Sequence, residues 1–351
     1  MVETNLLLSG MLFVLIVTTP FYAPITKRYE KKKIMMIAIF FLFIAVLLSA
    51  FSTNYYWLLL SRVMQGIFIP GITAIMLSYV QEIYPKEHRG LGMGIYMAAT
   101  GFGAVIGRLL AGWITYLYSW QEAFGLFALL LLVALLAMAW GLPRSKLDKN
   151  TKAKVQTKVL WDYLVDGQIL SILLIPMVVF FTFMAVTTFV TYHLVEAPFL
   201  LNASQLGNLF LILLLAVLVS PLAGRYSDKI GRVKILYLGL LSLIIGIVST
   251  LSSSLFLVVI GVGFVTVGMF TVQSVTPTYL GDLVPNNRET VAVLYQSFFY
   301  LGGALGTLVP AWAWKYGSYE GVVMLCLILL IIGIIPFIRY YIKKDRKNRN
   351  V

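Results

Sequence analysis

The sequence predicts an all-α polytopic membrane protein, and three observations support this fold class. First, 60% of the 351 residues are hydrophobic and only 12% are charged, whereas a typical soluble domain carries about 25% charged residues. Second, the hydrophobic residues form runs of about 20, the length of helix that crosses a bilayer core of about 30 Å. Third, the basic residues collect in alternate connectors between these runs. The runs do not alternate apolar and polar residues, so they do not have the pattern of a membrane β-barrel.

Eleven hydrophobic runs are long enough to span a membrane as helices. Several are separated by connectors of only a few residues, which favours antiparallel helical hairpins. In chain order, we predict spans at 5–24, 34–53, 57–81, 90–115, 121–141, 168–192, 206–223, 234–252, 254–281, 290–315 and 320–341.

The distribution of Lys and Arg predicts the orientation of the chain. Of the 27 basic residues, all but Arg62, Arg108 and Lys315 lie in or beside alternate connectors. Connectors rich in Lys and Arg remain in the cytoplasm. We therefore expect a multi-pass protein of the plasma (inner) membrane, with a cytoplasmic C-terminus and, because the number of spans is odd, an external N-terminus. This topology explains the net charge of +13, so we expect the lipid bilayer as a partner and no nucleic acid.

The only long polar connector, residues 142–167, divides five spans from six. We predict an N-terminal helical bundle at 1–141, a cytoplasmic linker at 142–167 and a C-terminal helical bundle at 168–351. Two bundles of this kind are typical of secondary transporters that contain internal repeats.

The two halves are related in sequence, which supports this division. SYVQEIYPKEHRGLGMGIY at 78–96 is similar to TYLGDLVPNNRETVAVLYQ at 278–296, an offset of 200 residues. An offset of 201 aligns Lys31 with Arg232 near the start of each half. A nearly constant offset over several helices indicates a repeated architecture.

The stretch GRYSDKIGRVK at 224–234 places two glycines and several charges at the end of a span. Gly224 would allow a close approach between helices. Asp228 and Arg232 have i,i+4 spacing, so we expect them to pair with each other or with neighbouring helix ends. We predict that Gly224, Asp228, Gly231 and Arg232 form a cytoplasmic gate, and the alternative is that the stretch only fixes topology.

The first-half counterpart is APITKRYEKKK at 23–33, which has Lys27 in place of the aspartate and Glu30 in place of a glycine. It cannot form the same gate with the same polarity. We interpret this copy as a topology signal.

These motifs resemble those of the major facilitator superfamily, and the similarity extends over essentially the whole chain. Its loop motif is matched by Gly224, Asp228, Lys229, Gly231 and Arg232, with Lys234 one place late. Arg62, Gln65 and Gly66 match the Arg-x-x-Gln-Gly of the family's fourth helix. Residues 101–120 resemble the fifth helix of bacterial efflux-type members, such as the acriflavin-sensitivity group.

The resemblance implies two pseudo-symmetric six-helix bundles around a central cavity, and secondary active transport of a small organic solute by alternating access. It favours export by a proton-coupled antiporter, working as a monomer without a cofactor. No Asp or Glu lies in the middle of a predicted span, however, and proton coupling usually needs such a group.

The chain begins where the second of the family's twelve helices is expected, and no segment corresponds to the first. We therefore expect a fragment, a truncated gene product or a reduced transporter of about eleven helices. A transporter relic that acts as a membrane interaction or assembly protein stays open as an alternative.

Polar side chains within the predicted spans are candidates for the substrate cavity or for ion coupling. The basic member Arg62 shares a helix face with Gln65, and this pair would favour an anionic or carbonyl-rich solute. The full set of candidates is Arg62, Gln65, Arg108, Gln273, Thr276 and Gln296. For each one the alternative is an interhelical hydrogen bond or contact with the membrane interface.

We predict no enzymatic activity, because the sequence has no His/Cys cluster, no paired acids and no nucleophile beside a base. For the same reason we expect no catalytic residue and no metal site. A channel is also disfavoured, since the sequence suggests neither a carbonyl filter nor a ring of charges.

Overall fold

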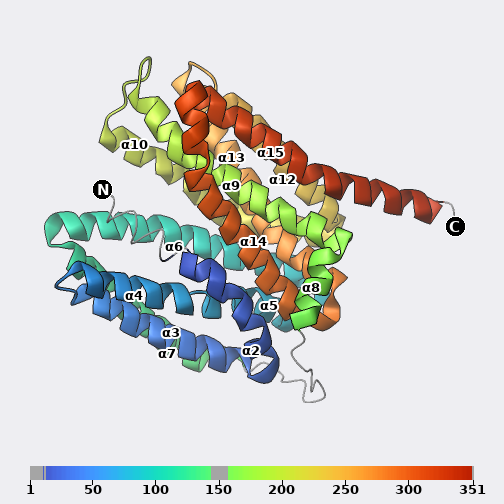
Figure 1. The fold of residues 1–351 in the computed structure, drawn as a ribbon, viewed down its shortest axis with the longest axis horizontal. Helices are drawn as coiled ribbons and strands as arrows, with labels where there is room; N and C mark the ends of the chain where they lie inside the picture. The colour runs from blue at the N-terminus through green and yellow to red at the C-terminus, as the bar shows by residue number, and fades with distance from the viewer. Residues whose placement is uncertain (1–10, 12, 144–156, 350–351) are drawn as a thin grey trace. The chain divides into compact units, whose positions relative to one another are not determined.

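The computed structural model describes residues 11, 13–143 and 157–349, and every element in these ranges is a helix (Figure 1). The predicted all-α fold class is confirmed. Ten helices in the described part of the chain are long and apolar enough to cross a membrane. The first predicted span, 5–24, lies partly outside the described residues, and a shorter apolar helix at Phe13–Thr26 covers the remainder.

The helices follow one another with short connections, as the hydrophobic runs predict. Those of the first half are α2 (Tyr22–Arg28), α3 (Lys31–Ala50), α4 (Tyr55–Phe68), α5 (Pro70–Ile83), α6 (Arg89–Leu117) and α7 (Trp120–Gly141). Those that follow are α8 (Thr157–Val165), α9 (Gly167–Val195), α10 (Ala203–Leu209), α11 (Leu215–Ile230), α12 (Arg232–Ser249), α13 (Leu255–Leu283), α14 (Arg288–Leu308) and α15 (Pro310–Arg349). Short 3₁₀ turns occur at Thr19–Phe21, Lys86–His88, Phe210–Leu214 and Pro285–Asn287.

Several helix ends differ from the predicted spans. The span expected at 206–223 is too short at its end, because α11 continues to Ile230. The additional residues are mostly polar, and a helix can continue in this way beyond the bilayer core. The span expected at 290–315 is divided, since α14 ends at Leu308 and α15 begins at Pro310. α15 then bends at Gly317 and Ser318, whose backbone angles are not helical.

The described residues fall into two compact units. Unit 1 lies within Met1–Ile83, Ile106–Thr157 and Val284–Ser297. Its core contains side chains from α2, α3, α5, α7 and α14, namely Tyr22, Ala23, Ile34, Met35, Ile39, Ala74, Ile75, Tyr79, Met138 and Val293. The start of α3 is attached to the end of α7 by Lys32, whose Nζ donates to the carbonyl oxygens of Ala139 (2.8 Å) and Leu142 (2.6 Å). A lysine at this position also complements the negative end of α7.

Unit 2 lies within Tyr84–Val105, Lys158–Leu283 and Phe298–Val351. Its helices approach closely at glycines, as is usual where membrane helices pack. A Cβ added to Gly246 of α12 would lie 2.6 Å from the carbonyl oxygen of Gly261 in α13. A Cβ added to Gly302 of α14 would overlap the carbonyl oxygen of Met177 in α9.

The glycines of α6 differ from this pattern. A helix with glycines at positions 101, 103, 107 and 112 is expected to contact its neighbours closely at these sites. Gly101 is such a site, because an added Cβ would lie 2.8 Å from the Cβ of Ala216. Gly103, Gly107 and Gly112 face open space among the described residues, so this expectation is wrong for these three.

Many large apolar side chains are exposed on the helices of both units. They include Phe41, Leu130, Val133, Leu238 and Ile331. A helix that is apolar on all its faces is typical of a membrane span. Together with the ten apolar helices, this surface is that of a multi-pass membrane protein.

Candidate functional site: a charged cluster at the ends of α6, α11 and α13

The GRYSDKIGRVK stretch changes direction at Gly231, between α11 and α12. Gly231 has a φ of +102°, a conformation that glycine adopts readily because it lacks a Cβ. α11 therefore stops at Ile230, and Arg232 is the first residue of α12. Asp228 and Arg232 consequently belong to two helices, although their i,i+4 spacing also fits one continuous helix.

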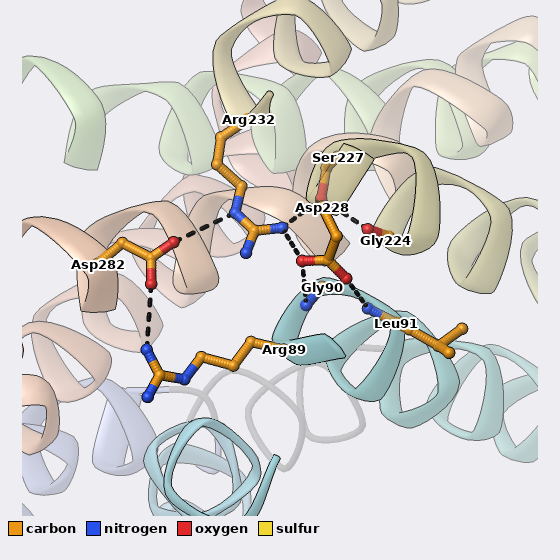
Figure 2. Close-up of polar contacts among 8 residues, drawn as sticks. All are labelled: Arg89, Gly90, Leu91, Gly224, Ser227, Asp228, Arg232 and Asp282. Carbon is orange, nitrogen blue, oxygen red and sulfur yellow. Dashed lines mark hydrogen bonds and ion pairs between the residues drawn. The ribbon is translucent and has the colours of Figure 1, made fainter. Parts of the chain in front are cut away.

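Asp228 lies in the last turn of α11 and points at the start of α6 (Figure 2). Its Oδ1 accepts a hydrogen bond from the backbone N–H of Gly90, and its Oδ2 accepts one from Leu91, both at 2.9 Å. The first N–H groups of a helix have no partner within the helix, and the positive end of the helix favours an anion. Asp228 therefore caps α6 from a segment about 138 residues away.

The close approach of α11 to α6 depends on two glycines that face each other. A Cβ at Gly224 would overlap the carbonyl oxygen of Gly90, and a Cβ at Gly90 would overlap that of Gly224. One turn further along α6, a Cβ at Gly94 would overlap the carbonyl oxygen of Ser220. The absence of side chains at these positions allows the Asp228 carboxylate to reach the backbone of α6.

Arg232 extends the polar contacts to α13. Its Nη1 donates to Asp228 Oδ1 (2.5 Å) and to Ser227 Oγ (2.7 Å), and its Nε donates to Asp282 Oδ2 (3.3 Å). Asp282 also pairs with Arg89, at 3.4 Å from Oδ1 to Nη1. Ser227 in turn donates to the carbonyl oxygen of Gly224 at 2.7 Å.

We call this set the Asp228 cluster; its members are Arg89, Gly90, Leu91, Gly224, Ser227, Asp228, Arg232 and Asp282, all of unit 2. The side chain of Asp228 is only 5% exposed and that of Arg232 only 11%. Buried charges are stable only when they are paired and hydrogen-bonded. Two carboxylates and two guanidinium groups balance each other here, so the cluster is electrically neutral.

Three of the four predicted gate residues, Gly224, Asp228 and Arg232, make contacts in this cluster, and Gly231 supplies the turn between the helices. Sequence reasoning missed Arg89, Gly90 and Leu91. The alignment of residues 78–96 with 278–296 places Asp282 opposite Glu82, but it gives no indication that Asp282 pairs with arginines. Backbone donors such as Gly90 and Leu91 leave no signal in a sequence.

Arg62 and Gln65 form a second, smaller polar group in unit 1. Arg62 Nη1 donates to Gln65 Oε1 at 3.0 Å, and Gln65 Nε2 donates to Ser49 Oγ at 2.9 Å. The hydroxyls of Ser49 and Ser61 are 2.7 Å apart. The guanidinium carbon of Arg62 also lies 4.7 Å from the ring centroid of Phe124, a cation–π distance. The hydrogen bond to Gln65 and the cation–π contact with Phe124 together fix the orientation of the Arg62 side chain.

The other predicted cavity residues are not joined to this group by any described contact. Thr276 is fully buried and donates to the carbonyl oxygen of Val272 in its own helix at 2.8 Å. Gln296 is buried. Gln273 Oε1 is buried without a hydrogen-bond partner among the described residues. Arg108 lies in α6, but its side chain is outside the described part.

No group of three or more His, Cys, Asp or Glu residues that could hold a metal occurs among the described residues. The Asp228 cluster is held together by ion pairs and hydrogen bonds. Its contacts join α6, from the first half of the sequence, to α11, α12 and α13 from the second.

Comparison with known proteins matches both halves of the chain to one family. The model of the Major Facilitator Superfamily matches residues 2–212 and 172–351. "Uncharacterized MFS-type transporter YybF" of Bacillus subtilis (strain 168) is 26% identical over 332 residues, which cover 94% of this chain and 82% of that protein. "Inner membrane transport protein YnfM" of Escherichia coli (strain K12) is 23% identical over 343 residues, which cover 95% of this chain and 79% of that protein.

A solved structure is similar over the same extent. The human organic anion transporter MFSD10 (TETRAN) has a TM-score of 0.82 to this chain at 18% sequence identity. The similarity covers 95% of this chain and 83% of that one. At this identity the likeness concerns the fold.

Proposed function

The chain belongs to the Major Facilitator Superfamily, and on this premise we propose that it moves a small organic solute across the membrane by alternating access. The Asp228 cluster is the observation that carries the mechanism. It joins segments from the two halves of the sequence through contacts that can break and re-form. We propose that the protein works as a monomer without a cofactor and lies in the plasma (inner) membrane.

In this proposal the Asp228 cluster is a cytoplasmic gate. When the two halves tilt against each other, the start of α6 moves away from the end of α11. The carboxylate of Asp228 then loses its hydrogen bonds to the backbone N–H groups of Gly90 and Leu91. Each of these groups binds water instead. Both arrangements satisfy the polar groups, so the two conformations can be close in free energy, as a transport cycle requires.

Export and proton coupling are further parts of the proposal. Export is supported by the similarity of residues 101–120 to efflux-type members of the family. Coupling to protons, as an antiporter, is supported by family membership alone. No Asp or Glu lies mid-span in the described spans.

Arg62 is the proposed contact for an anionic or carbonyl-rich group of the substrate. We expect Arg62→Ala to lower the transport rate at least about 10-fold, since a hydrogen bond to a charged group contributes about 1.5 kcal/mol or more. The rate is measured in proteoliposomes, with a substrate identified by screening solutes against a strain that lacks its other exporters.

Two variants control this experiment. Arg62→Lys keeps the charge but not the planar fork of donors, and we expect an intermediate rate. Lys86→Ala removes an exposed cation from a connector and should leave the rate unchanged. If Arg62→Ala transports at the wild-type rate, Arg62 has no part in the mechanism.

The proposed orientation places the basic connectors in the cytoplasm. In a background where the buried Cys326 is replaced by Ser, we expect Asp166→Cys and Asn286→Cys to react with a membrane-impermeant maleimide only from the cytoplasmic side. Tyr118→Cys, in the connector between α6 and α7, should react only from outside. All three positions are exposed. Labelling of positions 166 and 286 from opposite sides would contradict the topology.

A further inference from the structure

The last helix of the chain continues beyond its apolar part with a strongly basic segment. The apolar span of α15 ends at Tyr340, and the helix continues to Arg349 (Figure 1). Residues 339–349 contain six basic residues and one acid, Asp345, so their formal charge is +5. The basic residues are Arg339, Lys343, Lys344, Arg346, Lys347 and Arg349. We call residues 339–349 the basic end of α15.

Contacts within unit 2 fix the place where the basic end of α15 begins. The Tyr340 hydroxyl donates to Gln168 Oε1, at the start of α9, at 2.8 Å. The ring centroid of Phe337 lies 5.8 Å from that of Tyr237 in α12 and 6.4 Å from that of Tyr279 in α13. All of these residues belong to unit 2. The basic end therefore starts beside α9, α12 and α13.

One face of α15 is an exposed apolar stripe that ends in a cation. Four exposed residues share this face, because they are spaced by three or four positions; they are Ile328, Ile331, Ile335 and Arg339. Among the side chains that the structure describes, no carboxylate pairs with Arg339. An apolar stripe with an unpaired cation at its end matches the two parts of a phospholipid, the acyl chain and the charged headgroup.

The short helix α8 indicates the depth of this end of unit 2 in the membrane. α8 ends at Val165, and the extended backbone of Asp166 separates it from α9. Trp161 is 67% exposed and Val165 is 80% exposed, and their i,i+4 spacing places both on one face of α8. Tryptophan is enriched where a membrane helix meets the lipid headgroups. We therefore expect the start of α9, and with it Gln168 and Tyr340, to lie at headgroup level.

The rise of the helix decides which basic residues can reach the headgroups. A helix advances about 1.5 Å per residue, so the backbone of Lys344 lies at most about 6 Å beyond that of Tyr340. The headgroup layer on each side of the bilayer core is about 5–8 Å thick, and charges act over about 8–10 Å at ordinary salt concentrations. Arg339, Lys343 and Lys344 are therefore within reach of headgroup phosphates. Arg349, up to about 13 Å away, is at the edge of this range.

We propose that the apolar stripe and the basic end of α15 bind an anionic phospholipid of the leaflet that they face, which is the cytoplasmic leaflet in the proposed orientation. The headgroup phosphate binds Arg339, whose guanidinium can donate two parallel hydrogen bonds to phosphate oxygens. The charges of Lys343 and Lys344 add to the attraction, and an acyl chain lies along the stripe. The proposal is independent of the transport function, because it requires only that α15 spans a bilayer.

Charge identifies the lipid as anionic. A zwitterionic headgroup has no net charge, whereas basic residues close to a membrane surface attract anionic lipids. The basic residues also fit the role of a topology signal, which acts during insertion. That role needs no lipid bound to the folded protein, so lipid binding by the folded chain separates the two interpretations.

The test is lipid binding by the full chain in a neutral detergent, measured by native mass spectrometry. Palmitoyl-oleoyl phosphatidylglycerol is compared with phosphatidylcholine that has the same acyl chains. We expect tighter binding of phosphatidylglycerol, and we expect added salt to weaken it. Arg339→Gln should raise the Kd for phosphatidylglycerol about 5-fold, and the triple variant with Lys343→Gln and Lys344→Gln about 100-fold, since each basic residue near the surface contributes about 1 kcal/mol. The Kd for phosphatidylcholine should stay unchanged.

Matched variants separate a site on α15 from a general effect of charge. Lys315→Gln removes an exposed lysine from the other end of α15, and Lys229→Gln removes one from the end of α11. Both change the net charge as Arg339→Gln does, and both should leave the Kd for phosphatidylglycerol within about 2-fold of wild type, because the headgroup is bound by the basic end of α15. Arg339→Lys keeps the charge and should bind nearly as tightly as wild type. The single variant Arg339→Gln provides the measurement if the triple variant is not inserted.

Three results overturn the proposal. Equal affinities for phosphatidylglycerol and phosphatidylcholine in the wild-type protein would show that α15 does not select an anionic lipid. An equal loss of binding in Lys229→Gln and Arg339→Gln would show a diffuse basic surface and no site on α15. Displacement of the lipid by soluble glycerol phosphate at similar concentrations would show a site for a free phosphate. The measurement needs no substrate, so its outcome leaves the transport proposal untouched.

Discussion

Asp228→Asn is expected to shift the conformational equilibrium away from the state in which the Asp228 cluster is formed by about 100- to 4,000-fold, and to slow transport accordingly. Breaking a buried, hydrogen-bonded ion pair costs about 3–5 kcal/mol, and each 1.4 kcal/mol is a factor of ten. Asparagine has nearly the same shape as aspartate, but it carries no charge to balance Arg232. Its amide NH₂ can also replace an oxygen acceptor in front of Gly90 or Leu91. A transport cycle has to pass through both conformations, so depleting one of them slows it.

The measurements are substrate transport in proteoliposomes and amide exchange at Gly90 and Leu91. The matched control is Asp166→Asn. Asp166 also accepts hydrogen bonds from the N–H groups at a helix start, those of Gln168 and Ile169, but it is exposed and caps its own helix. Asparagine caps a helix about as well as aspartate, so no change is expected. Unaltered transport in Asp228→Asn would remove the gate from the mechanism.

Gly224→Ala is expected to lower transport by up to about 150-fold, because the added methyl group overlaps the carbonyl oxygen of Gly90. The clash is between a Cβ and backbone, so no side-chain rotation relieves it. Overpacking of this kind costs about 1–3 kcal/mol. α11 has to move away from α6, which lengthens the hydrogen bonds of Asp228 to the α6 backbone.

Transport and the melting temperature of the purified protein are the measurements for this variant. Gly103→Ala is the control, because an added Cβ there meets open space among the described residues. Alanine is also the better helix former, so Gly103→Ala should keep or slightly raise the melting temperature. Equal effects of the two substitutions would contradict the packing argument.

The fold class could be predicted from the sequence because hydrophobic length and charge placement report directly on the bilayer. The helix ends could not, since hydropathy measures the apolar part of a helix and not its full length. α11 continues past the predicted end at residue 223 to Ile230, and this extension brings Asp228 onto a helix that reaches α6.

The candidate site could be predicted only in part, for a reason seen in Asp228. Its spacing from Arg232 is visible in the sequence, and the two side chains do pair. Its partners on α6 are about 138 positions away and donate through the backbone, so neither spacing nor residue type indicates them. The glycines of α6 show the same limit, because the sequence does not reveal which face of a helix meets a neighbour.

Recognition of the α6 backbone by Asp228 has a consequence for mutational robustness. An N–H group is present whatever side chain follows it, so position 91 can change to any residue except proline and still donate to the carboxylate. Genetic screens for loss of function should therefore recover substitutions at Asp228 readily, and at position 91 only those that remove the amide hydrogen.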